Sequence, residues 1–78
     1  MKVSIIGAAG GLGSSTAFNI VTQGLADEMV LLDIRQSVLE NHILDIKDAA
    51  VACNQNVAIR AGRYEDMAGS GVVIMVAG

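Results

Sequence analysis

The chain has 78 residues, which is enough for one small domain. Hydrophobic residues make up 53% of it and charged residues 17%, but no uninterrupted apolar run approaches the roughly 18 residues of a membrane span, so no membrane partner is expected. The net charge is −3 and no basic cluster is present, which argues against nucleic acid as a partner. The single cysteine, Cys53, excludes an internal disulfide bond and fits a reducing, cytoplasmic location.

A glycine-rich loop follows the first predicted strand. The strand covers residues 2–6, and an apolar-periodic helix is predicted over residues 12–23. Gly7 permits a sharp turn out of the strand, Gly10 lets a diphosphate approach the main chain, and Gly13 lets the helix pack closely on the sheet. The N–H groups of the first helical turn have no intrahelical partner, and the helix dipole adds about half a positive charge there. This order of elements favours a pyrophosphate site.

The first helix is expected to bury one apolar face and to end at Gly24. The residues predicted on that face are Ala17, Ile20, Val21 and Leu25.

An acid at the end of the second predicted strand strengthens the argument. Glycine spacing alone also fits an ordinary turn between a buried strand and a helix. The strand at residues 29–32 ends in Asp33, twenty residues after Gly13. A carboxylate in this place accepts hydrogen bonds from a ribose diol in dinucleotide-binding folds. A surface turn acid or a helix cap is the other interpretation of Asp33, but loop, helix and acid together favour the dinucleotide site.

The second helix has the clearest pattern in the chain. Residues 37–40 read Ser-Val-Leu-Glu and match a capping box, which places the helix start at Ser37. Asn54 is expected to end the helix in the left-handed conformation. Apolar residues between them recur at helical spacing and predict one buried stripe, made of Leu39, Ile43, Ile46, Ala50 and Cys53.

Two more strands are predicted, at residues 57–61 and 72–77, with about one helical turn at 64–68. The first alternates apolar and polar residues, as an edge strand does, and the second is apolar throughout, which predicts burial on both faces. Strands that alternate with helices indicate an α/β fold. We expect a Rossmann-type half domain, with a parallel four-stranded sheet in the order 3-2-1-4 and both helices on one face.

The other face of this sheet is expected to be bare, because the link between the last two strands is too short for a covering helix. Leaving about half a dozen apolar side chains wet would cost on the order of 10 kcal/mol. The chain is therefore expected to be a fragment of a longer protein, or to form a homo-oligomer by self-association through the bare face.

Several segments carry a family resemblance. They read MKVSIIGAAGGLG at residues 1–13, ADEMVLLDI at 26–34, LDIKDA at 44–49, YED at 64–66 and VVI at 72–74, with AG at 77–78. In this succession the chain resembles the N-terminal NAD-binding part of the malate and lactate dehydrogenases. The resemblance leans toward malate dehydrogenases of the lactate-dehydrogenase-like kind and covers essentially all 78 residues.

The resemblance implies that residues 1–78 are the N-terminal fragment of a dinucleotide-binding domain whose cofactor is NAD, with the catalytic domain absent. The parent enzyme would pass a hydride between NAD and a small 2-hydroxy acid, with malate favoured over lactate. Its catalytic residues would lie beyond Gly78, so the chain alone is expected to be inactive. The implied cofactor-binding residues are Gly7, Ala8, Ala9, Gly10, Gly11, Leu12 and Gly13 at the pyrophosphate, Asp33 at the adenosine ribose, Ile34 and Tyr64 near the adenine, and Ala77 and Gly78 beside the cofactor.

Some residues keep two interpretations. Tyr64 is either an adenine neighbour or a half-buried aromatic over the sheet edge. Arg35 either softens the preference for NAD by attracting a 2′-phosphate or is a solvated turn cation. His42 is expected to be a solvated helix residue, and no spacing of acids with His or Cys indicates a metal site. Two other classes remain open, namely an epimerase or short-chain reductase and a non-catalytic nucleotide-binding module.

Overall fold

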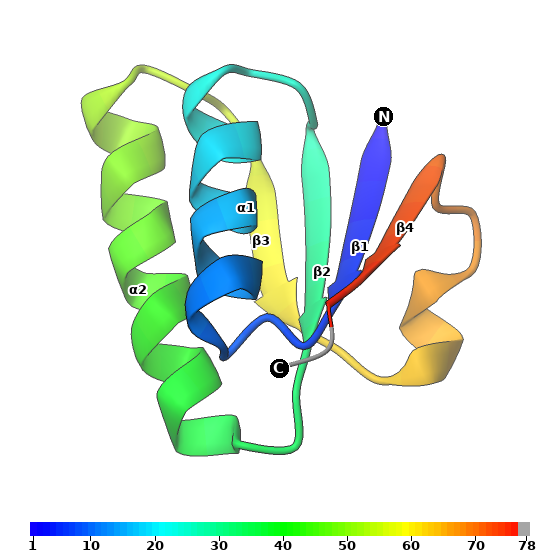
Figure 1. Cartoon of the computed structure of the whole chain (residues 1–78). Coiled ribbons are helices and arrows are strands. Elements are labelled where there is room, and N and C mark those ends of the chain that lie inside the picture. Colours follow the sequence, from blue (N-terminus) through cyan, green and yellow to red (C-terminus); the bar gives the residue numbers. More distant parts are fainter. Residues whose placement is uncertain (77–78) are drawn as a thin grey trace.

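Four parallel strands and two long helices make up the computed structural model, which describes residues 1–76 (Figure 1). The strands pair side by side in the order β3-β2-β1-β4, and α1 and α2 lie together on one face of the sheet (Figure 1). The predicted α/β half domain, its strand order and its one-sided pair of helices are confirmed. The elements in chain order are β1 (Lys2–Ile6), α1 (Gly11–Thr22), β2 (Glu28–Leu32), α2 (Gln36–Ala52), β3 (Ala58–Ala61), the 3-10 helix η1 (Tyr64–Met67) and β4 (Val72–Met75).

The helix α1 ends close to the predicted position. Gly24 adopts a φ of +69°, which only glycine takes up without strain, and the chain turns there toward β2. Ala17 and Val21 are fully buried, as predicted. Leu25 is 53% exposed, so its predicted place on the buried face is wrong; it lies beyond the end of the helix and no longer shares the helical period.

The helix α2 begins one residue before the predicted cap. Its flanking residue is Arg35, and no side chain caps its first turn, so the predicted capping box at Ser37 is wrong. Hydrogen bonds that Asp33 accepts explain the earlier start. Its carboxylate accepts the Arg35 N–H at 2.9 Å, and its carbonyl accepts the Gln36 side-chain amide at 2.6 Å. Asn54 ends the helix with a φ of 56°, which confirms the predicted left-handed terminator.

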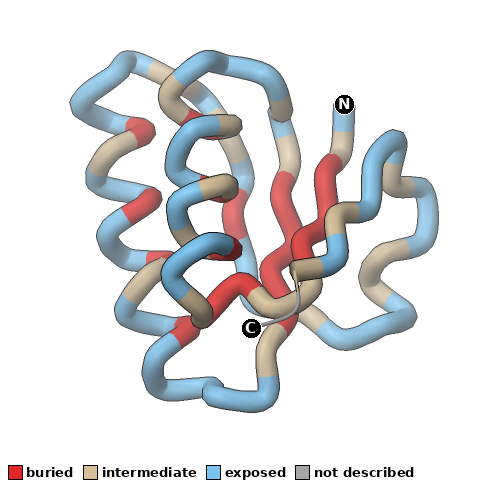
Figure 2. Tube along the Cα trace, in the orientation of Figure 1, coloured by how far each residue is buried: buried red, intermediate tan, exposed pale blue. Residues whose placement is uncertain are grey.

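The core lies between the helices and the sheet. Figure 2 shows that buried residues concentrate in β1, in β2 and on the inward sides of the helices. Cys53 is exposed because it follows the last helical residue, so its predicted place in the stripe is wrong. The rest of the predicted stripe is confirmed, and it packs in one cluster with the sheet; the cluster includes Leu39, Ile43, Ile46 and Ala50 from α2 and Val3, Ile5, Met29, Leu31 and Ile59 from the strands.

The second face of the sheet is covered in part. Val30 and Ser4 are fully buried there, although no long helix lies over them. The Ser4 and Ser70 hydroxyls are 2.6 Å apart, and a Cβ on Gly62 would collide with the Val30 side chain. The segment from Gly62 to Ser70, which includes η1, therefore packs on the middle of this face. The expected bare face is wrong at this place, because a short irregular segment can cover side chains without a helical pattern.

The strand β4 is less buried than predicted. Val73 is 50% exposed and Met75 is 75% exposed, so the expectation of burial on both faces is wrong. Among residues 1–76 this strand pairs only with β1, which leaves its outer edge and part of both faces open. Residue 77 of the predicted strand lies outside the described residues. The opposite edge of the sheet is β3, where Ile59 is buried and Arg60 exposed, as predicted for an edge strand.

Within residues 1–76 no helix has the length and apolar character needed to cross a membrane.

Candidate functional site

The glycine loop is held against the end of β2. The Gly7 and Ala8 N–H groups both donate to the Leu32 carbonyl, at 2.8 and 3.1 Å. Gly7 has a φ of +85°, and a Cβ there would collide with the Val76 carbonyl oxygen. A Cβ on Gly13 would collide with the Gly7 carbonyl oxygen. A side chain at Gly7 would push the loop away from Val76, and one at Gly13 would push α1 away from the loop. A Cβ on Gly11 would meet nothing within 4 Å.

The amide groups of the loop divide into two sets. The Ala9 N–H donates to Asp33 Oδ2 at 3.0 Å, and the Gly10 N–H donates to the Gly7 carbonyl at 3.3 Å. The next three N–H groups, at residues 11–13, find no hydrogen-bond partner within residues 1–76, and no side chain caps α1. They are the free donors at the positive end of a 12-residue helix, which is the arrangement that binds an anion.

Asp33 links the ends of β1 and β2. Its side chain is only 5% exposed, and besides the Ala9 N–H it accepts the Arg35 backbone N–H at 2.9 Å. The Arg35 guanidinium forms an ion pair with the same carboxylate. These hydrogen bonds, led by those from the Arg35 side chain, lower the pKa of Asp33 from 3.8 to about 2. The acid is therefore fully charged at neutral pH and fixed beside the helix end.

A cavity of about 830 Å³ opens at this edge of the sheet. Its volume lies in the range of about 300–1,000 Å³ that is typical of small-molecule and cofactor sites. Ala8 and Ala9 of the loop are buried and do not line the cavity, and neither does Gly13. Ala77 and Gly78 lie outside the described residues. The predicted site residues that line the cavity are Gly7, Gly10, Gly11, Leu12, Asp33, Ile34 and Tyr64.

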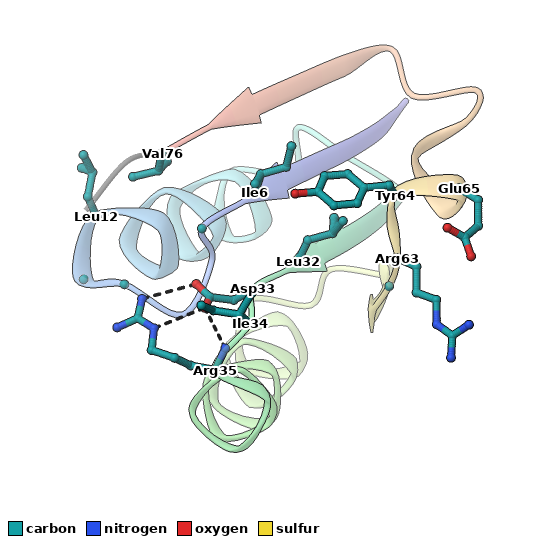
Figure 3. A pocket seen from close by; sticks show the side chains of 14 residues that line it. Ile6, Leu12, Leu32, Asp33, Ile34, Arg35, Arg63, Tyr64, Glu65 and Val76 are labelled. Atoms are coloured by element: carbon teal, nitrogen blue, oxygen red, sulfur yellow. Dashed lines mark hydrogen bonds and ion pairs between the residues drawn. The ribbon is translucent and has the colours of Figure 1, made fainter.

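Tyr64 lies on the cavity wall contributed by η1. Its ring points toward Ile6 and Leu32, and the Asp33–Arg35 pair lies at another part of the wall (Figure 3). The side chain is 70% exposed, so the interpretation as a half-buried aromatic is wrong. Ile34 is 95% exposed and presents a second apolar surface to the cavity. Both residues are therefore available to contact a flat ring in the cavity.

Sequence reasoning missed part of the lining. Three of the missed residues, Gly62, Arg63 and Glu65, come directly after β3. Their position after a strand could have identified them. The carboxyl ends of parallel strands meet at one edge of a sheet, so the residues that follow the third strand also lie at the edge where the site is. The remaining missed lining residues are Ile6, Leu32 and Val76; Arg35 also lines the cavity, in agreement with its interpretation as a neighbour of the ribose.

The described residues fit a dinucleotide in three ways. Three unpartnered amides are free to bind an anion, a charged carboxylate is placed to accept sugar hydroxyls, and apolar side chains line the remaining wall. His42 lies in a different groove between α1 and α2 and does not line this cavity.

Comparison with known proteins agrees with this arrangement. The family model described as "lactate/malate dehydrogenase, NAD binding domain" matches residues 1–78. The chain belongs to this family. Of the classes left open by the sequence, the epimerase and the short-chain reductase are not the family that matches.

Curated members of the lactate/malate dehydrogenase family match over almost the whole chain. The L-lactate dehydrogenase of Thermus aquaticus is 44% identical over 78 residues, which is 100% of this chain and 24% of that protein. The malate dehydrogenase of Natronomonas pharaonis is 44% identical over 79 residues, which is 99% of this chain and 26% of that protein. The chain thus spans about a quarter of the length of its relatives.

Solved structures of the lactate dehydrogenases share the fold. The enzyme of Cryptosporidium parvum, complexed with lactic acid and NAD, superposes with a TM-score of 0.87 at 32% identity, over 97% of this chain and 24% of that one. The minor L-lactate dehydrogenase of Enterococcus mundtii, in a ligand-bound form, has a TM-score of 0.88 at 38% identity, over 99% of this chain and 24% of that one.

Proposed function

We propose that the chain binds NAD at the carboxyl edge of its sheet and forms the cofactor-binding part of a lactate/malate-type dehydrogenase. One observation carries the proposal. The Asp33 carboxylate, on a side chain that is 5% exposed, accepts the Ala9 N–H of the glycine loop and so lies beside the unpartnered amides at the start of α1. A sugar-binding acid and an anion-binding helix end are thereby held in one cavity, which suits the ribose and diphosphate of one ligand.

Each part of the site has one task in this proposal. The amides of Gly11 and Leu12 hold the diphosphate, since they remain free and line the cavity, and the free amide of Gly13 adds to the positive end of the helix. Asp33 accepts the hydroxyl groups of the adenosine ribose and repels a phosphate at the 2′ position. Ile34 and Tyr64 offer apolar surface to the adenine. The cofactor itself, when bound, supplies the nicotinamide ring that accepts or donates the hydride.

The activity proposed for the whole protein is hydride transfer between NAD and a small 2-hydroxy acid. The matched relatives include enzymes named L-lactate dehydrogenase and malate dehydrogenase, which supports the substrate class. The preference for malate over lactate stays a prediction. Transfer to a 2-oxo acid also needs a proton donor and a cationic clamp for the substrate carboxylate, and within residues 1–76 the cavity wall contains no histidine.

Isothermal titration of NAD into the purified protein tests the proposal. Asp33→Ala should weaken binding by about 10- to 100-fold, because hydrogen bonds to a charged group contribute roughly 1.5–3 kcal/mol. Asp48→Ala is the matched control, since it removes the same charge from an exposed position on α2. Circular dichroism confirms that both variants are folded. Equal NAD affinity in the unaltered protein and in Asp33→Ala would refute the ribose role.

Two further proposals concern the protein's surroundings. The exposed Val73 and Met75 on β4 support self-association through this part of the sheet, because no element formed by residues 1–76 covers these two large apolar side chains. The exposed free thiol of Cys53 supports a reducing, cytoplasmic location.

A further inference from the structure

All acceptor positions of Asp33 are already in use. A carboxylate has about four lone-pair sites. Oδ1 accepts the Arg35 backbone N–H at 2.9 Å and Arg35 Nε at 3.2 Å, and Oδ2 accepts Arg35 Nη2 at 3.3 Å (Figure 3). Oδ2 also accepts the Ala9 N–H at 3.0 Å. A ribose diol that approaches Asp33 therefore has to replace one of these donors.

The guanidinium is the donor that can leave. The two backbone N–H groups belong to the glycine loop and to the start of α2, so their release would disrupt the fold around the site. The Arg35 side chain is 52% exposed, and its two hydrogen bonds are the longer ones of the four. Rotation of this side chain into solvent would free one acceptor position on each carboxylate oxygen, which matches the two hydroxyls of a ribose.

The guanidinium also lies over the glycine loop. A Cβ built on Gly10 would be 3.4 Å from Arg35 Nη2, so the arginine head is close to the loop at the place where Gly10 leaves room. Arg35 and Gly10 line the same cavity as Asp33. The arginine head therefore occupies the space between the acid and the loop, which is the space for the sugar in the proposed function.

A 2′-phosphate on the ribose changes the competition between Arg35 and the ribose for Asp33. A guanidinium has five N–H donors, and Asp33 uses two of them, which leaves three for another anion. Charge-assisted bonds from arginine to phosphate are strong and frequently bidentate. A 2′-phosphate can thus bind to the arginine at the mouth of the site, whereas an unmodified ribose gains nothing from it and has to displace it.

We infer that Arg35 is a cofactor-selectivity residue that masks Asp33 and narrows the preference for NAD over NADP. The inference rests on the proposed function and goes beyond it in assigning two opposite effects to one side chain. Arg35 lowers the affinity for NAD by competing for the carboxylate, and it raises the affinity for NADP by binding the added phosphate. The other interpretation, that Arg35 is only a solvated turn cation, predicts neither effect.

Titrations of NAD and of NADP into Arg35→Ala test the inference. The variant keeps the backbone N–H that Asp33 accepts. Its NAD affinity should rise about two- to fivefold, the range measured for release of an exposed ion pair. Its NADP affinity should fall about tenfold, so the ratio of the two dissociation constants should change in favour of NAD by about 20-fold or more. Arg35→Lys keeps the charge but loses the planar fork, so it should gain NAD affinity and lose less NADP affinity than Arg35→Ala does.

Lys47→Ala is the control for the change of charge, since Lys47 is exposed on α2 and does not line the cavity. It should leave the ratio unchanged. The Arg35 Hε resonance gives a second readout: NAD should shift it toward the position of a solvent-exposed arginine. An unchanged ratio in Arg35→Ala, or an unmoved resonance in the NAD complex, would overturn the inference while NAD binding itself still supports the proposed function. Failure of the unaltered protein to bind either dinucleotide would overturn both.

Discussion

Replacing Gly13 with alanine tests whether the close approach of α1 to the glycine loop stabilises the domain. The added Cβ would collide with the Gly7 carbonyl oxygen and lie 2.9 Å from Ala8 Cα. These are backbone atoms, so no side-chain rotation relieves the contact and the helix has to move. Overpacking of this kind costs about 1–3 kcal/mol. Since 1 kcal/mol shifts the Tm of a domain of 60–100 residues by roughly 4–8 °C, a cost of about 2 kcal/mol predicts a decrease of roughly 8–16 °C.

Thermal unfolding followed by circular dichroism at 222 nm measures the effect. Gly11→Ala is the matched control, because a Cβ there meets nothing within 4 Å and alanine is a better helix former than glycine. Its Tm should stay the same or rise. Similar Tm values for Gly13→Ala and Gly11→Ala would show that the contact between loop and helix does not constrain residue 13, and the argument for the tight loop would fail.

Three other predictions concern pH, the core and the open part of the sheet. The pKa of Asp33 is about 2 in the folded protein and 3.8 without the fold, so its stabilising effect should be complete above about pH 5 and be lost as the pH falls from 4 to 2. Acid unfolding should therefore show the free-energy difference between the unaltered protein and Asp33→Asn shrinking in that range, and a constant difference would contradict the pKa. Leu39→Ala should lower the free energy of unfolding by about 2–5 kcal/mol in urea, because Leu39 is fully buried, whereas Leu44→Ala, at a 61% exposed position of the same helix, should cost less than about 1 kcal/mol. Replacing Val73 and Met75 together with serine should reduce self-association in light scattering and the binding of a hydrophobic dye; a monomeric, dye-free unaltered protein would remove the reason for the self-association proposal.

Patterns that repeat along the chain predicted most of the fold. The alternation of short apolar runs with helical stripes predicts a parallel sheet, and the Rossmann-type pattern predicts its strand order. The single hand of parallel crossovers then places both helices on one face. The stripe from Leu39 to Ala50 was recognised for the same reason, since burial on a helix follows its period. The pattern fails at its last member, Cys53, because the helical period predicts burial only within the helix and Cys53 follows the last helical residue.

Features that depend on one irregular segment or one side chain could not be predicted. The burial of Val30 and Ser4 depends on the residues between Gly62 and Ser70. The sequence of this segment has no periodic apolar pattern from which its packing on the sheet could be predicted. The exposure of β4 depends on what lies beside it, which its own apolar composition does not reveal.

The candidate site shows the same division. The glycines and Asp33 could be predicted from spacing, because each position has a backbone or charge requirement that few residues meet. The pairing of Arg35 with Asp33 could not, since it depends on a rotamer of an exposed side chain.

Titration of NAD into the isotope-labelled protein, followed by amide NMR, tests whether the cavity at the carboxyl edge binds the dinucleotide. We expect the largest shifts at the N–H groups of Gly11 and Leu12, with smaller ones at Ala9 and Gly13 and none at the end of α2. Shifts centred on the groove around His42, or no shifts at millimolar NAD, would contradict the assignment of the cavity at the carboxyl edge as the dinucleotide site.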